Sequence, residues 1–428
     1  RIQTYIPVKA GGKFDPENST GLAHYLEHMM FKGNDAFGSK DWETEKVYVD
    51  SIENMFEHYR TLTDAGERKA YYKKIDEVSN EASKYAIANE YDKMCSFIGA
   101  SGTNAYTTED RTVYVNNIPS NQIENWLALE SARFNKIVNR LFHTELEAVY
   151  EEKNRSLDND GWKVYENLYK AMFKKHKYGT QTVIGTIEHL KNPSIKDINA
   201  YFENYYVPNN VAICMSGDLD PDKTIKMIDQ YFGKWEKGNV PTYTPAVEDA
   251  LETQTVEIFG PDAEGVTIGF RFGGSSSDDI PVAMMVDYIL DNSVAGLINL
   301  NLVQQQKVLS AGCYIDQLND YSIHTFYGNP REGQSLDDVR DEILSQIDKV
   351  KNGEFEDWLL EAIINDFKKS RMSQMENNGA RANAMVMAFT NNMDWKDYIS
   401  LIANMEKVTK EDIMNFAKAN YQNYVQVN

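Results

Sequence analysis

The sequence has few cysteines and no long apolar run. Its 428 residues include three cysteines, Cys95, Cys214 and Cys313, and this small, widely spaced set excludes a dense disulfide framework but not an oxidising compartment. No apolar run approaches the roughly 18 residues that a membrane-spanning helix requires. We therefore expect a soluble body without a membrane-spanning segment.

Positive charge is also in deficit. The formal net charge of −21 argues against nucleic acid and against an anionic membrane surface as partners, because both would repel the chain. Acidic walls around a closed chamber would attract basic peptides. Ordinary solubility explains the same total, since net charge does not say where the charges lie, and both interpretations stay open at this point.

Histidine is scarce as well, and this makes one pair stand out. Of seven histidines, His24 and His28 are four residues apart, and Glu27 directly precedes the second. At about 100° per residue these three side chains share one helix face, while Leu22 and Leu26 fall on the opposite face. The apolar face is expected to pack against a core, which leaves the other face for chemistry.

The spacing of the two histidines suits a metal ion. Neutral imidazoles at i and i+4 can both reach one tetrahedral Zn²⁺ at about 2.0 to 2.1 Å, and a catalytic site adds a third protein ligand and an open position for water. Glu27 could take the proton of that water. A pair of surface or packed histidines is the alternative, but a chance H-x-x-E-H is on the order of one in a hundred for this composition. Ser19 or Thr20 is expected to cap the helix.

A third ligand should come from another element, and an acidic segment beginning at Thr144 is the best candidate. It opens like a capping box, with Glu147 three residues after Thr144. Glu145 and Glu152 fall on one helix face, whereas Glu147 and Glu151 point elsewhere. A solvated acidic helix surface is the alternative for such a run. Given the upstream histidines, Glu152 is the expected ligand.

The two motifs together resemble a known family. H-x-x-E-H followed by E-x-x-A-V-x-x-E is similar to the inverzincin zinc metallopeptidases, the family of pitrilysin, insulin-degrading enzyme and the mitochondrial processing peptidase. Further segments resemble landmarks of that family: residues 102–114, 178–179, 185–193, 205–210 and 216–218. The resemblance is dense in the first half of the chain and present in outline in the second, so it implies a bacterial-type member that carries the zinc-bearing half.

The resemblance implies a zinc-dependent endopeptidase that hydrolyses peptide bonds in unfolded peptides or small polypeptides. One Zn²⁺ per chain would be held by His24, His28 and Glu152. Glu27 would be the general base toward a metal-bound water, and Glu145 a nearby supporting acid in the catalytic group. The rival interpretations are a metal hydrolase acting on non-peptide amides and a non-catalytic or partner-dependent subunit that binds or presents peptides, although such subunits typically lose the metal residues.

The resemblance also implies residues that contact the peptide. Asn104 and Ala105 would lie along the bound peptide, which would add as a strand to a sheet edge. The family holds the peptide carbonyl with an arginine and a tyrosine from a non-metal domain. Tyr314 fits the tyrosine, but Lys307 stands where arginine is expected, and lysine offers a point charge in place of a planar fork. Packing is the alternative role for both.

The departure at Lys307 and the chain ends predict a partner. Arg1 begins directly in one predicted strand and Asn428 ends in another, so we expect a piece of a longer protein. Besides peptide substrates, the expected partner is a second homologous subunit, a missing C-terminal half or a homodimer. The compartment is not fixed by the sequence, with the periplasm favoured over the cytoplasm.

The predicted fold class is α+β, with two tandem, structurally related domains, each a mainly antiparallel sheet covered by helices. Residues 266–272 alternate like a strand and lead through a glycine pair into an apolar helix at 281–290. The same order of strand, Gly11-Gly12, polar loop and helix precedes the histidine pair. The second copy contains a single histidine, His324, so it is expected to be a structural partner without metal.

We expect a zinc-bearing domain at 1–238, a linker at 239–252 and a non-metal domain at 253–428. The path between the two motifs is long, and the surplus, about 40–89, is predicted to be a helical hairpin inserted in the first domain. The hairpin could restrict substrates or contact a partner. A solvated insertion without a special role is the other interpretation.

Overall fold

The computed structural model describes residues 1–292 and 294–428, which form two compact units. Unit 1 consists of Arg1–Arg155, Gln181–Thr244 and Asn377–Thr390, and unit 2 of Ser156–Thr180, Pro245–Glu376 and Asn391–Asn428. Each unit has its own hydrophobic core, and each takes in one segment from the other half of the chain. The linear domain limits at 238 and 253 stay a prediction.

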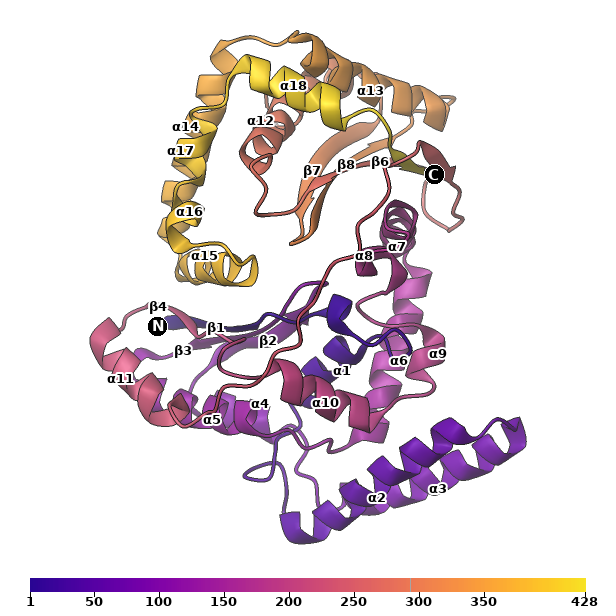
Figure 1. The fold of residues 1–428 in the computed structure, drawn as a ribbon, viewed down its shortest axis with the longest axis vertical. Coiled ribbons are helices and arrows are strands. Elements are labelled where there is room, and N and C mark those ends of the chain that lie inside the picture. The colour runs from indigo at the N-terminus through magenta and orange to yellow at the C-terminus, as the bar shows by residue number, and fades with distance from the viewer. Residues whose placement is uncertain (293) are drawn as a thin grey trace. The chain divides into compact units, whose positions relative to one another are not determined.

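The sheet of unit 1 has four antiparallel strands in the order β2-β3-β1-β4 (Figure 1). They are β1 (Ile2–Val8), β2 (Ser101–Thr107), β3 (Thr112–Ile118) and β4 (Cys214–Gly217). Alternate residues of β1 such as Ile2 and Ile6 are buried, which is the period-two pattern of a strand with one face on a core. Strand β2 is an edge strand, since among the described strands only β3 pairs with it.

Helices cover both faces of this sheet. One face is covered by α15 (Asn378–Thr390), which packs against β1 and β4, and Figure 1 shows α4, α5 and α10 on the other side. The helices other than α15 are α1 (Leu22–Met29), α4 (Glu90–Phe97), α5 (Ile123–Asn135), α6 (Phe142–Asp158), α9 (Ile187–Leu190), α10 (Ile195–Tyr205) and α11 (Pro221–Phe232). The apolar face of α1, including Leu22 and Leu26, is buried in the core as predicted.

The predicted helical hairpin is confirmed. It consists of α2 (Trp42–Thr61) and α3 (Ala65–Ser83), which pack against each other (Figure 1). A buried ion pair fixes its base, because Arg140 Nε donates to Glu45 Oε1 at 2.7 Å. The same guanidinium donates to the backbone carbonyls of Lys32 and Asn34, so the hairpin is fastened to the loop that follows α1.

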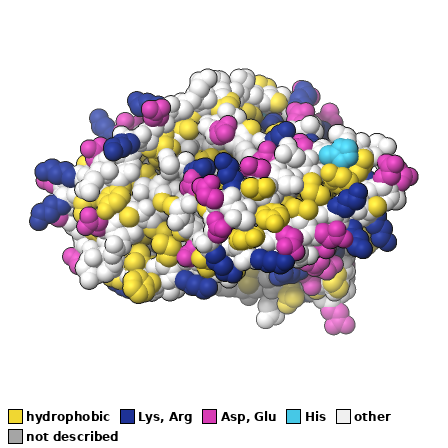
Figure 2. All heavy atoms as spheres, turned by 90° about the horizontal axis from the view of Figure 1, so that it is seen from below, with side chains coloured by type: hydrophobic (Ala, Val, Ile, Leu, Met, Phe, Trp, Pro, Cys, Tyr) yellow, Lys and Arg dark blue, Asp and Glu magenta, His cyan; other side chains and the backbone are white. Residues whose placement is uncertain are grey.

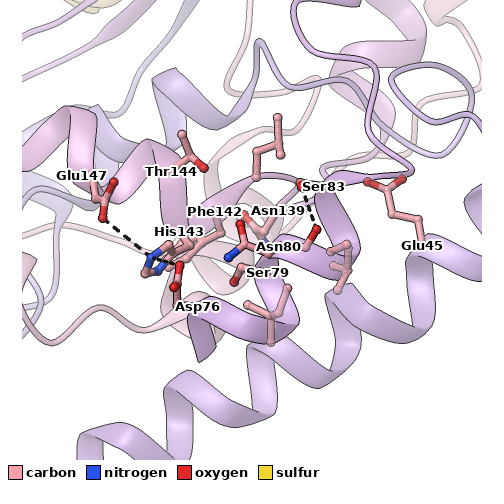
Figure 3. A pocket seen from close by; sticks show the side chains of 14 residues that line it. Glu45, Asp76, Ser79, Asn80, Ser83, Asn139, Phe142, His143, Thr144 and Glu147 are labelled. Carbon is pink, nitrogen blue, oxygen red and sulfur yellow. Dashed lines mark hydrogen bonds and ion pairs between the residues drawn. The ribbon is translucent and has the colours of Figure 1, made fainter. Parts of the chain in front are cut away.

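A polar cavity of about 200 Å³ lies between the hairpin and the start of α6 (Figure 3). His143 faces it, with Nε2 3.4 Å from Asp76 and 3.8 Å from Glu147. In the described part of the chain, buried His143 Nδ1 and Ser79 Oγ have no hydrogen-bond partner. The size and polarity of the cavity suit ordered water. Because Glu147 lines the cavity, its carboxylate faces the hairpin.

Figure 2 shows one face of the molecule, on which acidic and basic side chains are interspersed. The net charge of −21 is therefore not gathered into a single acidic patch on this face.

The sheet of unit 2 has five strands in the order β5-β9-β6-β8-β7. They are β5 (Gln254–Val256), β6 (Val266–Gly273), β7 (Ser310–Gln317), β8 (Tyr321–Asn329) and β9 (Val425–Val427). The described pairs are antiparallel except β5 with β9. The predicted fold class of mainly antiparallel sheets covered by helices is confirmed.

The helices of unit 2 repeat the plan of unit 1. After β6 comes α12 (Ile280–Leu290), so the predicted second copy of strand, glycine turn and helix is present. The other helices are α7 (Asp160–Met172), α8 (Lys177–Thr180), α13 (Leu336–Asn352), α14 (Trp358–Met375), α16 (Trp395–Ile399), α17 (Leu401–Met405) and α18 (Lys410–Asn420). Among the residues described, no helix combines the length and apolar character needed to cross a membrane.

Candidate metal centre

The histidine helix α1 is anchored at its start by a residue well upstream. One carboxylate, that of Asp15, accepts the backbone N–H groups of Gly21 at 2.6 Å, Leu22 at 3.1 Å and Ala23 at 2.9 Å. The expected caps Ser19 and Thr20 are wrong, because the cap residue is Gly21, with φ of +89° and no side chain to accept a bond. A buried carboxylate at this positive end satisfies the free amides and interacts favourably with the helix dipole.

Replacing Asp15 with alanine is therefore expected to lower the free energy of unfolding by about 2 kcal/mol, because three buried amides lose a charged acceptor. Urea denaturation of the variant beside wild type measures this. Glu17→Ala is the matched control, since Glu17 is an exposed acid in the same loop. Equal stability of the two variants would contradict the role given to Asp15.

The predicted ligands come together where α1 meets α6. His24 Nε2 lies 3.7 Å and His28 Nε2 3.5 Å from Glu152 Oε2, and the three ligand atoms are all within 4.8 Å of one another. Tyr25 helps to hold the two helices, because its hydroxyl donates to the Phe142 carbonyl at 2.6 Å. Two imidazoles and a carboxylate at these separations fit a tetrahedral Zn²⁺ with an open fourth position.

The two histidines are held in different electrostatic surroundings. Burial, together with nearby His28, lowers the pKa of His24 to about 3, so this imidazole is neutral at physiological pH, as a metal ligand must be. Burial also acts to lower the pKa of His28, but the hydrogen bond to Glu145 and the surrounding carboxylates outweigh it and raise the value.

Glu145 lies behind His28, away from the three ligand atoms. Its Oε1 is 2.7 Å from His28 Nδ1, and its Oε2 pairs with Lys32. Burial acts to raise the pKa of Glu145, but the bonds to His28 and Lys32 lower it overall, which keeps the carboxylate ionised. A carboxylate on Nδ1 orients the ring so that Nε2 faces Glu152, the arrangement found behind many metal-bound imidazoles.

Glu27 lies on α1 with its carboxylate almost buried and 8% of its surface exposed. Thr107 Oγ1, at the end of edge strand β2, donates to Glu27 Oε2 at 2.6 Å. Burial raises the pKa of Glu27, while the Thr107 bond and His28 lower it in part. A carboxylate with a raised pKa beside the three candidate ligands can accept a proton and donate it again.

Strand β2 carries the two residues predicted to follow a bound peptide. Asn104 is exposed and Ala105 is buried, so they point to opposite sides of the strand. Since β2 packs against α1 and Thr107 donates to Glu27, this edge strand leads to the candidate centre.

Tyr314 and Lys307 lie in unit 2. The half-exposed Tyr314 on β7 lines a hollow of about 240 Å³ together with Tyr165, Tyr169 and Tyr327. Lys307 pairs with Glu342 on α13, with Nζ 3.1 Å from Oε2. The ammonium group of Lys307 is thus already engaged by a carboxylate.

Two family models match the chain. The model described as "Insulinase (Peptidase family M16)" matches residues 3–79, which contain His24, Glu27 and His28. The model described as "Peptidase M16 inactive domain" matches residues 194–367, which contain Lys307 and Tyr314. The chain carries domains of the M16 peptidase family. The helix that bears Glu145 and Glu152 falls between the two matched ranges.

Relatives of this M16 chain include proteins named as zinc proteases. "Zinc protease PqqE" of Helicobacter pylori is 22% identical over 384 residues, covering 88% of this chain and 75% of the relative. An "Uncharacterized zinc protease" of Rickettsia felis is 20% identical over 56% of this chain, which corresponds to 46% of that protein. The aligned part is thus about half the length of some of these relatives.

Solved structures agree on the M16 fold. A protease from Helicobacter pylori superimposes with a TM-score of 0.80 at 19% identity, covering all of this chain and 94% of the other. Pitrilysin superimposes with a TM-score of 0.70 at 16% identity, and there the whole chain corresponds to 42% of the neighbour.

The sequence predictions missed two partners of the candidate centre, Lys32 and Thr107. Lys32 stands four residues after His28, one helical turn on, but α1 has already ended there. Thr107 belongs to the segment 102–114 that resembles a family landmark, and its pairing with Glu27 depends on how β2 lies beside α1. Neither contact has a signal in the local pattern.

Proposed function

We propose that this M16 chain is a zinc-dependent endopeptidase acting on unfolded peptides or small polypeptides. The observation that carries the proposal is the convergence of His24, His28 and Glu152 within 4.8 Å, with the Glu27 carboxylate on the same helix as the histidines. The zinc-protease names of the relatives support it.

In this proposal each residue of the centre has one task. His24, His28 and Glu152 would hold zinc, which when bound polarises the scissile carbonyl and acidifies a water molecule. Glu27 would accept a proton from the attacking water and donate it to the leaving amine. Thr107 fixes the carboxylate of Glu27 by its hydrogen bond.

The substrate is proposed to bind as an added strand along β2. This strand is an edge of its sheet, so its outer main-chain groups can pair with an extended peptide. Asn104 and Ala105 would lie along that peptide. Main-chain pairing supplies affinity without a fixed sequence, so unfolded peptides are preferred over folded proteins.

A partner is proposed to complete the site. This chain corresponds to 42% of pitrilysin, and it covers 86% of another neighbour, the first half of the periplasmic protease PqqL from Escherichia coli. Tyr314 and Lys307 would assist the peptide carbonyl. Because Lys307 offers a point charge in place of the planar fork of an arginine, a homologous subunit, another half or a second copy would supply that fork. We also propose a periplasmic location.

The test is to incubate the zinc-loaded protein with a mixed library of unfolded peptides, alone and with a candidate partner half, and to detect products by mass spectrometry. Cleavage by the chain alone, absent after chelation, supports the proposal. Cleavage only with the partner supports a shared active site. Peptide binding without cleavage in either case would replace the proposal with a non-catalytic subunit, a role that the inactive-domain match over 194–367 allows.

A further inference from the structure

A second cluster of metal-binding side chains lies wholly within unit 2. It consists of Asp287 on α12, Cys313 on β7 and His324 on β8. Asp287 Oδ1 lies 3.1 Å from His324 Nε2 and 3.4 Å from Cys313 Sγ, and the three ligand atoms are all within 4.8 Å of one another.

The sheet register explains why these residues meet. On the antiparallel pair β7 and β8, His324 is opposite Ile315, and Cys313 is two residues from Ile315. Residues two apart in a strand point to the same face, so Cys313 and His324 are diagonal neighbours on one face. Helix α12 packs on β7 and brings Asp287 over this pair.

We propose that Asp287, Cys313 and His324 bind a second divalent ion of the zinc class, with a structural role in unit 2. Thiolate, imidazole and carboxylate are the usual ligands of zinc, and at ligand distances of about 2.0 to 2.3 Å a tetrahedral ion separates them by roughly 3.3 to 3.6 Å. From the Asp287 oxygen, Cys313 Sγ lies at 3.4 Å, within this range, and His324 Nε2 at 3.1 Å, slightly below it.

The surroundings of the cluster also suit a cation. The imidazole of His324 is fully buried, and its Nδ1 is 2.7 Å from the Tyr421 hydroxyl, so its Nε2 faces the other two ligands. The only ion pair of the Asp287 carboxylate in the described part of the chain is with His324. Asp291 adds negative charge beside Cys313, whose N–H it accepts at 3.3 Å.

An ion here would clamp α12 to β7 and β8 without any part in peptide hydrolysis, so this inference stands apart from the proposed function. A network of hydrogen bonds without an ion, in which the thiol and the imidazole both donate to Asp287, is the competing arrangement. The two differ in whether the Cys313 sulfur binds a metal as thiolate.

Cobalt titration of the reduced protein distinguishes the metal site from the hydrogen-bonded network, because a cobalt–thiolate bond absorbs in the near ultraviolet. Wild type is expected to take up two equivalents of Co²⁺ and to show this band. Cys313→Ser should retain one equivalent and lose the band. Cys214→Ala is the matched control, since Cys214 is a buried thiol on β4 outside both clusters, and it should behave as wild type.

Further variants assign the two equivalents. Glu152→Ala should lose the other equivalent and keep the near-ultraviolet band, whereas His324→Gln should lose the second site with Cys313 intact. Circular dichroism checks that each variant is folded. Absence of the band in folded wild-type protein, or its persistence in Cys313→Ser, would overturn the proposal in favour of the hydrogen-bonded network.

Discussion

Glu27→Gln is expected to lower kcat for peptide cleavage roughly 10²- to 10⁴-fold, the usual contribution of a positioned general base. Glutamine has nearly the same shape and can still accept the hydrogen bond that Thr107 donates at 2.6 Å. The amide cannot take a proton from water, so only the proton-transfer step is removed. Initial rates with a fluorogenic unfolded peptide measure the effect, with the partner half present if the chain needs one.

The same variant should keep its metal, because Glu27 is not one of the three clustered ligands. Metal analysis and the melting temperature beside wild type distinguish a lost base from a lost site. Glu147→Gln is the matched control, since Glu147 is an exposed acid that faces the hairpin, and its rate should be unchanged. Undiminished cleavage by Glu27→Gln would remove Glu27 from the mechanism.

Much of the local structure could be predicted from sequence because it is set by short-range periodicity. The helical spacing of His24 and His28 and the hairpin within 40–89 are visible in the pattern of apolar residues, and the structure confirms these helices. The relation between Glu145 and Glu152 also follows from helix geometry, since residues seven apart lie two turns along one face.

The helix starts could not be predicted in the same way. The capping box expected at Thr144 is wrong, because α6 begins at Phe142, directly after Leu141 with φ of +56°. A leucine in this left-handed region is held there by its surroundings and by no local preference. The cap of α1 likewise comes from Asp15, and only the path of the intervening loop brings that carboxylate back to the helix.

Contacts between residues far apart in the sequence could not be predicted either. The prediction that the second copy carries no metal rested on its single histidine, His324, and it stays a prediction. The structure brings Asp287 and Cys313 to this histidine through strand register and helix packing, which a linear pattern does not contain. For the same reason the sequence did not indicate that Asn378–Thr390 would pack on the sheet of unit 1.

Glu152→Ala is expected to lower zinc affinity more than about 100-fold, because it removes one of three direct ligands. Loss of a residue that only supports a ligand typically lowers metal affinity by roughly 10- to 100-fold. Glu152 Oε2 is the only carboxylate oxygen grouped with both imidazoles among the described residues. Competition with a zinc indicator measures the change in affinity. Peptide cleavage should be lost together with the metal, in contrast to Glu27→Gln.

The neighbouring acids of α6 supply the controls for this prediction. Glu151→Ala and Glu147→Ala remove exposed carboxylates from other faces of the helix and should leave zinc affinity unchanged. Because the second cluster would bind its own ion, the count is cleanest in a Cys313→Ser background, where one bound zinc should fall to none on adding Glu152→Ala. One zinc still bound in that double variant, with Cys313 and Glu152 both removed, would move the third ligand to Glu151, Glu147 or Glu145.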